Sequence, residues 1–264
     1  MATADLDGVA LHYEVRGTGP RLLFLNGSGG TLAEAAPLII PLTSHFEVAA
    51  FDQRGMGRSA PAAGPYGMAD LGADAAALAD HLGWPTFRLL GFSFGGMVAQ
   101  ELAVTRPGRV ERLALLCTSS GGRGGSSFPL HTLGQLLPGE RETRYARLLD
   151  TRFTAEWLAG HPGDRALVAP MRGRLTSDKP DRIRRGEDFQ LRARADHDVY
   201  DRLAAVTCPT LVAAGRYDGI APVANSEAIA RAVPDTELRL FDGGHLFPFQ
   251  DPTALPAIVD FLSR

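Results

Sequence analysis

Short runs of apolar residues recur along this chain, separated by longer stretches in which apolar positions have a helical spacing. The runs predict buried strands near residues 21–26, 46–51, 86–91, 110–117, 209–215 and 236–241. Helices are predicted near residues 33–43, 67–82, 94–105, 223–232 and 252–263. Two more short strands, near Leu6 and at Leu11–Val15, are expected to form an antiparallel edge. This alternation is typical of an α/β protein with a doubly wound, mostly parallel sheet and helices on both faces.

The alternation stops between residues 121 and 203. This segment begins with a run rich in glycine and serine, and helical stretches follow near residues 129–137, 140–150, 154–159, 164–176 and 181–195. Because the segment follows the sixth strand, it is predicted to form a helical cap, or lid, that shuts water out of a site at the sheet. The prediction divides the chain into a core, residues 1–120 and 204–264, and a cap, residues 121–203.

The most informative motif is Gly91-Phe92-Ser93-Phe94-Gly95, which joins a predicted strand to a predicted helix. Strand, sharp turn and helix form the setting in which G-x-S-x-G places a nucleophilic serine. Glycines two positions either side of Ser93 leave room where the strand and the helix nearly touch. A helix N-terminus beneath the hydroxyl also favours negative charge that develops there. The motif therefore predicts Ser93 as a nucleophile.

A serine hydroxyl needs a base to take its proton, and the base needs an acid to orient it. Asp218 follows the predicted strand at residues 209–215, and His245 follows the one at residues 236–241 in a Gly-Gly-His loop. Both side chains therefore lie just beyond the carboxyl ends of strands, where catalytic groups gather in open parallel sheets.

At this point the chain resembles the α/β-hydrolase superfamily over nearly its whole length. The resemblance rests on five motifs in the expected order, which are Asn26–Gly30, Asp52–Ser59, Gly91–Gly95, Gly215–Asp218 and Gly243–His245. It implies an eight-stranded sheet with a helical cap inserted after the sixth core strand. The family usually has a His-Gly-rich loop where this chain has Asn26, which leaves the shape of that loop less certain.

The resemblance implies a triad of Ser93, Asp218 and His245, but these residues also have simpler structural interpretations. Ser93 could be an ordinary helix N-cap, and Asp218 could cap the helix that begins near Pro222. Asp242 is a rival acid because it is closer to His245 in sequence. The other histidines lack the Gly-Gly loop and are expected to be surface or satisfied residues; they are His12, His45, His81, His131, His161 and His197. His197, which lies in the predicted cap, could also touch substrate.

An oxyanion hole needs backbone N–H donors aimed at the charge of a tetrahedral intermediate. The residue after the nucleophile, Phe94, is expected to supply one N–H and Ser28 the other. The Ser28 hydroxyl is a third donor or a simple turn serine. Asn26 and Gly27, in the same loop, are predicted to contact the substrate.

The cap carries aromatic and basic residues that bear on substrate binding. Most of its aromatic side chains are expected to pack the cap onto the core, with Phe128 and Trp157 predicted to face the substrate. Arginines gather at Arg182–Arg185 and Arg192–Arg194. They would suit a substrate carboxylate, but a solvated face with interspersed acids is the more economical interpretation.

Composition excludes several other classes of function. A net charge of −3 gives no argument for nucleic acid or a membrane surface as partner. The start of the chain shows no secretory signal, and no apolar run approaches the roughly 18 residues that cross a bilayer. The two cysteines, Cys117 and Cys208, are expected to be buried free thiols in a reducing cytoplasm. No metal-ligand pattern is visible, so neither metal nor cofactor is expected. Arginine far outnumbers lysine, which favours a bacterial source, and a monomer or homodimer is expected.

The sequence thus predicts a hydrolase that cleaves a small-molecule ester or lactone through an acyl-enzyme. Among serine members, the chain looks most like 3-oxoadipate enol-lactonase-like and small carboxylesterase-like enzymes. C–C bond hydrolases and cofactor-free perhydrolases of the fold use the same triad and remain alternatives. A small-molecule sensor that keeps the triad but turns over slowly is a further alternative from a different class.

Overall fold

The computed structural model describes residues 2–176 and 178–264 of the chain. Met1 of the predicted core and Ser177 of the predicted cap lie outside these ranges. The centre of the molecule is an eight-stranded sheet with the order β1-β2-β4-β3-β5-β6-β7-β8. Its strands are β1 (Ala2–Leu6), β2 (Val9–Arg16), β3 (Arg21–Leu25), β4 (Glu47–Phe51), β5 (Phe87–Phe92), β6 (Val110–Leu116), β7 (Thr210–Gly215) and β8 (Thr236–Phe241).

The sheet is mostly parallel, as predicted. β1 pairs antiparallel with β2, and β2 pairs antiparallel with β4, so the first two strands form the antiparallel edge. From β4 to β8 every pairing is parallel. The carboxyl ends of β3 to β8 therefore meet at one edge, where the loops that follow them come together.

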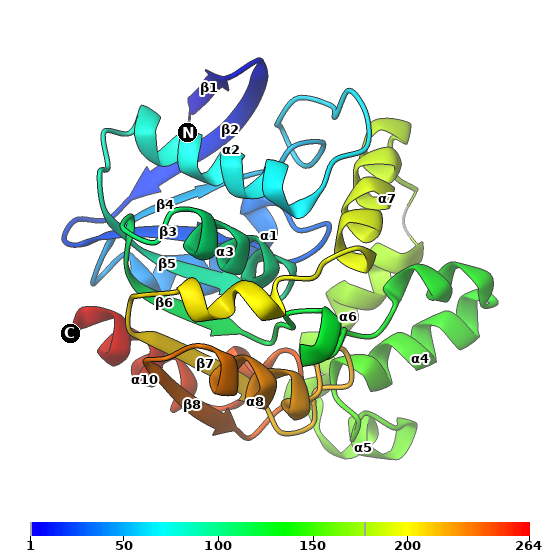
Figure 1. Ribbon diagram of the computed structural model, residues 1–264. Helices are drawn as coiled ribbons and strands as arrows, with labels where there is room; N and C mark the ends of the chain where they lie inside the picture. The colour runs from blue at the N-terminus through cyan, green and yellow to red at the C-terminus, as the bar shows by residue number, and fades with distance from the viewer. Residues whose placement is uncertain (1, 177) are drawn as a thin grey trace.

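Helices cover both faces of the sheet (Figure 1). They are α1 (Leu32–Leu42), α2 (Met68–His81), α3 (Phe94–Thr105), α8 (Val223–Ala232), α9 (Phe247–Gln250) and α10 (Ala254–Ser263). Alternate residues of one strand serve the two faces: Leu22 and Phe24 pack with α1 and α10, whereas Leu23 and Leu25 pack with α2 and α3. Because both faces are covered, the central strands are apolar at nearly every position.

Between β6 and β7 the chain leaves the sheet and forms a helical insertion. Its elements are the 3-10 helices η1 (Gly122–Gly124), η2 (Leu130–Gln135) and η3 (Tyr200–Ala205) and the α-helices α4 (Pro138–Leu149), α5 (Ala155–Gly160), α6 (Pro162–Thr176) and α7 (Asp181–Ala195). Figure 1 shows α4 to α7 gathered at one end of the sheet. The chain leaves and returns at adjacent points, because Gly121 forms an isolated β-bridge with Asp198 and the Val199 N–H donates to Ser120 O.

The insertion shares an apolar cluster with the core. Leu133, Leu148 and Phe153 of the insertion pack together with Ile220 and Leu246, which follow β7 and β8. The insertion therefore rests directly on the two loops that carry Asp218 and His245. No helix in residues 2–176 and 178–264 combines the length and apolar character needed to cross a membrane.

The predicted strands and the long helices agree with the structure to within about two residues. Prediction missed α9 and the 3-10 helices η1 and η3. All three are one or two turns long, and so short an element offers no apolar periodicity to detect.

Candidate active site

Ser93 lies at a sharp turn between β5 and α3, in a backbone conformation that side chains rarely adopt. Its φ is 56° and its ψ is −116°, and strain of this kind is typical of residues held in place for function. A Cβ at Gly91 would overlap the carbonyl oxygen of Gly95, and a Cβ at Gly95 would overlap that of Leu25. The Ser93 N–H donates to Leu116 O over 2.8 Å, which ties the turn to β6. The two glycines are thus required by close backbone approach, as the motif predicts.

His245 and Asp218 form a hydrogen-bonded chain with Ser93. His245 Nε2 lies 2.8 Å from Ser93 Oγ, and His245 Nδ1 lies 2.8 Å from Asp218 Oδ2. Asp218 Oδ1 accepts the N–H groups of Ile220 at 2.7 Å and Ala221 at 2.9 Å. Both carboxylate oxygens are therefore engaged, and the Asp218 side chain is fully buried. With the Nδ1 proton directed at Asp218, Nε2 is left to accept the proton of Ser93.

The rival acid and the capping alternative do not match this geometry. Asp242 is 70% exposed, and its Oδ1 accepts from Arg152 rather than from His245. Asp218 bonds N–H groups of its own loop, whereas the N-cap of α8 is Pro222. The acid within reach of His245 is therefore Asp218.

The cap histidine His197 lies beneath the point where the insertion returns to the core. It is buried, and its Nε2 has no hydrogen-bond partner among the described residues. Burial lowers the pKa of His197 to about 4, and the nearby Glu101 carboxylate only partly offsets this effect. His197 is absent from the lining of the cavity around Ser93, so the structure does not place it as a substrate contact.

The turn after β4 holds neighbouring loops by hydrogen bonds. Asp52 accepts the N–H groups of Leu32 and Arg58, one on each carboxylate oxygen. Arg54 forms a two-pronged ion pair with Asp74 of α2. These contacts give the family motif at Asp52–Ser59 a structural role.

The loop after β3, residues 26–30, lies against the Ser93 turn, because a Cβ at Gly27 would stand 3.5 Å from Ser93 Cβ. Asn26, which replaces the family histidine, organises this loop with both ends of its side chain. Its Oδ1 accepts the Gly27 N–H, and its Nδ2 donates to Thr31 O. The substitution therefore preserves a defined loop, and Asn26 and Gly27 both line the cavity around Ser93.

Two backbone N–H groups near Ser93, those of Phe94 and Ser28, have no acceptor among the described residues. The Phe94 N–H is the first of α3 and so has no acceptor within the helix. In the loop at residues 26–30, the Ser28 N–H has no acceptor among the described residues, whereas its neighbours Gly27, Gly29 and Gly30 all donate to one. The Ser28 Oγ is also buried without a hydrogen-bond partner in the described part of the chain. Phe94 and Ser28 are the residues predicted from the sequence as oxyanion donors, and that role stays a prediction.

A cavity of about 110 Å³ contains Ser93 and His245. Its lining is mainly apolar and includes Phe92, Leu149 and Ile220, with Phe249 also part of the wall. A second cavity of about 440 Å³ adjoins it and has four lining residues in common, which are Ser28, Leu130, Tyr145 and Met171. The wall of the second cavity combines apolar side chains with ionisable ones, which include Arg141 of α4 and Arg184 and Glu187 of α7. A mainly apolar chamber next to Ser93 thus adjoins a larger one that also has ionisable side chains in its wall.

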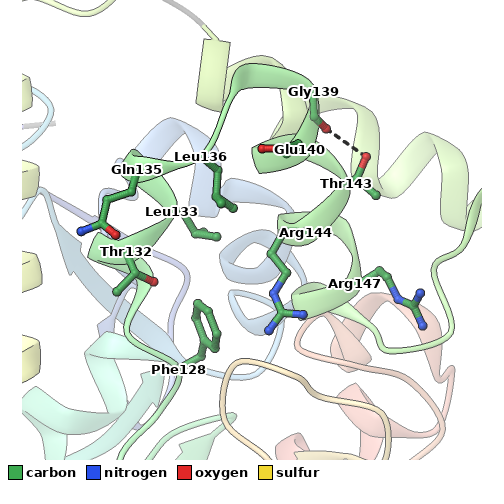
Figure 2. A pocket seen from close by; sticks show the side chains of 10 residues that line it. All are labelled: Phe128, Thr132, Leu133, Gln135, Leu136, Gly139, Glu140, Thr143, Arg144 and Arg147. Carbon is green, nitrogen blue, oxygen red and sulfur yellow. Dashed lines mark hydrogen bonds between the residues drawn. The ribbon is translucent and has the colours of Figure 1, made fainter.

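Phe128 and Trp157, predicted to face the substrate, lie elsewhere. Figure 2 shows Phe128 facing Arg144 across a groove of about 740 Å³ between η2 and α4, and the Arg144 guanidinium is 5.3 Å from the ring centroid. Trp157 stacks on His161 at 3.9 Å, and its Nε1 donates to Asp164. Neither ring lines the cavity around Ser93. Both are turned to partners within the insertion, which spacing along the chain does not predict.

The insertion instead reaches this cavity through residues that the sequence did not single out. They are Leu130, Tyr145, Leu149 and Met171. Tyr145 is one of the aromatic residues of the predicted cap, but nothing in the neighbouring sequence distinguishes it from the others. Ile220, Leu246 and Phe249 also line the cavity, and their closeness to Asp218 and His245 in sequence was an available signal.

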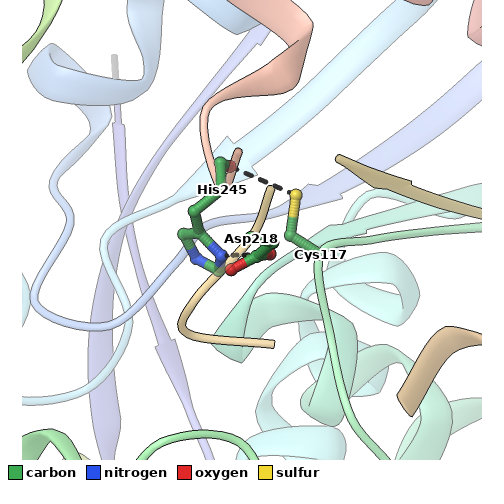
Figure 3. Close-up of side chains that lie close together, drawn as sticks. All are labelled: Cys117, Asp218 and His245. Carbon is green, nitrogen blue, oxygen red and sulfur yellow. Dashed lines mark hydrogen bonds and ion pairs between the residues drawn. The ribbon is translucent and has the colours of Figure 1, made fainter. Parts of the chain in front are cut away.

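Cys117, Asp218 and His245 are the one group among residues 2–176 and 178–264 with potential metal ligands close together, within 4.8 Å of one another (Figure 3). The Cys117 thiol donates to the His245 carbonyl over 3.1 Å. Burial, with a smaller effect from the Asp218 charge, raises the pKa of this thiol well above its ordinary value. A metal needs the thiolate, so the donor set does not fit one. Of the three side chains, His245 and Asp218 already bond each other through Nδ1 and Oδ2, as parts of the hydrogen-bonded chain to Ser93.

The C-terminal end of α4 bonds directly to the loops of Asp218 and His245. The Leu148 carbonyl accepts the Gly219 N–H over 3.0 Å, and the Leu149 carbonyl accepts the His245 N–H over 2.6 Å. Beyond the helix, the Thr151 N–H donates to Tyr217 O over 2.9 Å. The insertion is therefore hydrogen bonded to the backbone of the candidate base itself.

Comparison with known proteins agrees with this geometry. A family model described as alpha/beta hydrolase fold matches residues 20–252. The 3-oxoadipate enol-lactonase 2 of Acinetobacter baylyi is 28% identical over 99% of this chain and 96% of its own length. A poly(3-hydroxyalkanoate) depolymerase of Ectopseudomonas oleovorans is also 28% identical, over 99% of this chain and 92% of its own. The crystal structure of a hydrolase from Pseudomonas aeruginosa PA01 has a TM-score of 0.81 at 30% identity and covers 100% of this chain and 98% of that one.

Proposed function

The chain belongs to the α/β-hydrolase fold family, and from that premise we propose that it is a serine hydrolase that cleaves a small-molecule carboxylic ester or lactone. The observation that carries the proposal is the hydrogen-bonded chain from Ser93 through His245 to Asp218. It supplies a nucleophile, a base and an orienting acid in the order along the chain that this fold uses.

The first half of the reaction forms an acyl-enzyme. His245 Nε2 takes the proton of Ser93 Oγ as the oxygen attacks the substrate carbonyl. Asp218 stabilises the imidazolium that results. The N–H groups of Phe94 and Ser28 receive the negative charge of the carbonyl oxygen. The protonated His245 then donates its proton to the leaving alkoxide as the carbon–oxygen bond breaks.

The second half releases the acid. A water takes the place of the leaving group, gives its proton to His245 and attacks the acyl carbon. The tetrahedral intermediate collapses, and Ser93 Oγ leaves with the proton returned from His245. In a lactone the leaving alkoxide stays attached to the acyl part, so one hydroxy acid is the product.

The cavities support a division of the substrate. The chamber of about 110 Å³ beside Ser93 has room for a short apolar acyl group, and the adjoining one of about 440 Å³ suits a larger polar part. The similarity to an enol-lactonase and to a polyester depolymerase supports an ester or lactone bond as the target. A small cap-covered site supports a small molecule rather than a polymer chain.

The test is a panel of p-nitrophenyl acetate, butyrate and octanoate and of five- and six-membered lactones, assayed with the wild type and with Ser93→Ala. Repeated turnover by the wild type, with highest kcat/KM on short acyl chains, supports the proposal. One burst of p-nitrophenol per protein followed by arrest would favour the sensor instead. Equal weak activity of both proteins would overturn the assignment of Ser93.

A further inference from the structure

One buried side chain of the insertion holds the loop at residues 26–30. Gln190 lies in α7 and is 1% exposed. Its Oε1 accepts the Gly29 N–H over 2.6 Å, and its Nε2 donates to Gln53 Oε1 over 3.1 Å. Gln53 Nε2 in turn donates to Asn26 O over 2.9 Å. The insertion is therefore linked to both parts of this loop by a continuous series of hydrogen bonds.

These bonds determine which N–H of the loop stays free. The Gly27 N–H is taken by Asn26 Oδ1 and the Gly30 N–H by Gly27 O. The Gly29 N–H donates to Gln190 of α7, outside the loop. Ser28 then holds the one N–H of residues 27–30 without an acceptor among the described residues, and Ser28 lines both cavities.

The loop cannot select this arrangement by its own stiffness. Three of its five residues are glycine, and Gly29 has a φ of 67° in the left-handed region. Glycine crosses between backbone conformations at little steric cost, so neighbouring peptide groups can turn toward or away from the cavity. If the Gly29 N–H lost its acceptor, it would compete with Ser28 for any negative charge beside Ser93.

We propose that Gln190 is a positioning residue of the active site, which engages the Gly29 N–H and so directs the Ser28 N–H to the oxyanion. The inference rests on the proposed hydrolase function. Gln190 touches no reacting atom in this scheme and acts through the loop. A glutamine suits the position because it has an acceptor for Gly29 and a donor for Gln53 at one end.

Three variants test the proposal. Gln190→Leu keeps a similar volume but removes both hydrogen bonds. Gln190→Glu keeps the acceptor for Gly29 and loses the donor to Gln53. Phe189→Ala is the matched control: Phe189 lies next to Gln190 in α7, and its ring packs edge-on against Tyr66, with the ring centroids 6.0 Å apart.

The measurements are kcat and KM on p-nitrophenyl butyrate, the inhibition constant of phenylboronic acid, and Tm. Boronic acids form a tetrahedral adduct on an active serine, so their affinity reports the oxyanion donors. Loss of a whole oxyanion donor costs about 10²–10³ in kcat, and for Gln190→Leu we expect a loss of about 10- to 100-fold. KM should change less than twofold, and phenylboronic acid should weaken by the same factor as kcat. Gln190→Glu should recover most of the loss.

The control separates positioning from packing. Phe189→Ala should lower Tm yet leave kcat and phenylboronic acid affinity within twofold of the wild type. The proposal is overturned if Gln190→Leu keeps both quantities within twofold. It is also overturned if Phe189→Ala lowers both as much as Gln190→Leu does, because the packing of α7 would then account for the effect.

A readout without catalysis separates this inference from the proposed function. Hydrogen exchange followed by mass spectrometry should show faster exchange of residues 26–31 in Gln190→Leu, and no change there in Phe189→Ala. If the wild type hydrolyses no ester while exchange responds as expected, the proposed function fails and the anchoring of the loop by Gln190 stands. If the wild type hydrolyses esters and exchange does not respond to Gln190→Leu, the inference alone fails.

Discussion

The turn that carries Ser93 and the end of α4 both hold parts of the candidate triad, but they are built in opposite ways. The turn is set by Gly91 and Gly95, residues two positions away, through close backbone approach. The end of α4 reaches His245 across 96 positions of sequence, through the bond from the His245 N–H to Leu149 O. The nucleophile is thus positioned locally, whereas the base depends on how the insertion docks.

Side-chain contacts also hold the C-terminal end of α4 and the residues after it against the core. Asp150 is fully buried and bonds Arg152 on one side and Gln250 on the other. Arg152 also pairs with Asp242 and lies 3.9 Å from the centroid of the Tyr217 ring. These residues surround the loops that carry Asp218 and His245. The insertion therefore contributes directly to holding the loops of Asp218 and His245 in place.

The largest expected effect on activity comes from a substitution in the turn that carries Ser93. Ser93→Ala should lower kcat by about 10⁴-fold or more, because the nucleophile is lost while binding and the oxyanion donors remain. Steady-state hydrolysis of p-nitrophenyl butyrate measures it, with Ser44→Ala, an exposed serine, as the control. Residual turnover above about 1% of the wild-type rate would show that another group performs the attack.

Gly95→Ala tests how firmly the turn is set by backbone approach. The added Cβ would overlap the carbonyl oxygen of Leu25, and backbone cannot yield as a flexible side chain does. We expect a loss of about 3 kcal/mol in the free energy of unfolding, measured in urea, with most activity lost as well. Gly108→Ala is the matched control, since a Cβ there meets nothing within 4 Å. Equal stability of the two variants would show that the turn relaxes easily.

Arg152→Ala tests the contacts between the end of α4 and the loops of Asp218 and His245. It leaves the buried Asp150 carboxylate without its cation, and because Arg152 itself is one-fifth exposed, we expect a loss of about 2–3 kcal/mol in unfolding free energy. Since Tyr217 and the His245 loop lose their support, kcat should also fall, by about tenfold.

Two further variants interpret that result. Adding Asp150→Asn should restore part of the stability, because no unpaired charge is then buried. Arg123→Ala removes an exposed ion pair with Asp201 in the same insertion and should leave Tm and kcat unchanged. A fall in kcat with Arg123→Ala would mean that the insertion responds as a whole rather than through the end of α4.

A smaller effect, on the pH dependence of stability, is expected from His197, where the insertion returns to the core. The pKa of His197 is about 4 in the folded protein, against an ordinary value of 6.5 that we take for the unfolded chain. Between pH 4 and 6.5 the unfolded chain therefore binds more protons than the folded protein does. Stability is then full above pH 6.5 and falls as the pH drops toward 4, by about 2 kcal/mol between pH 7 and pH 5.

Urea denaturation at a series of pH values measures this, with the wild type compared with His197→Asn. The charged groups acting on the ring are Glu101, Asp198 and Arg202, and they are unchanged in the variant. The variant should show a flatter dependence, and His45→Asn, an exposed histidine, should not. Parallel curves for His197→Asn and the wild type would mean that other groups control stability in acid.

Most of the secondary structure of the core could be predicted from the sequence, because each strand or helix is indicated by residues within or next to it. Strand boundaries agree to within about two residues, since an apolar run between turn residues is read without knowing its neighbours. The order Ser93, Asp218, His245 and the choice of Ser28 and Phe94 followed from motifs at strand ends. The hydrogen bonds among the triad side chains match that expectation.

For the insertion, the sequence predicted the helices but not how they pack against the core. Phe128 and Trp157 were chosen because they are aromatic, yet they pack against Arg144 and His161 within the insertion. Tyr145 is also an aromatic residue of the insertion, yet it lines the cavity around Ser93. What separates them is the direction each helix presents to the core, and this depends on docking rather than on spacing along the chain.

The sequence by itself determined the sheet, the turn at Ser93 and the residues at the strand ends, because each depends on neighbours a few positions away. Only the tertiary structure decided that Gln190 binds Gly29 and that Leu149 holds His245, contacts that span 161 and 96 positions. It also decided the size and the lining of the two cavities. Such contacts arise when separately formed elements pack, and no periodic pattern in the chain records which side chain will meet which loop.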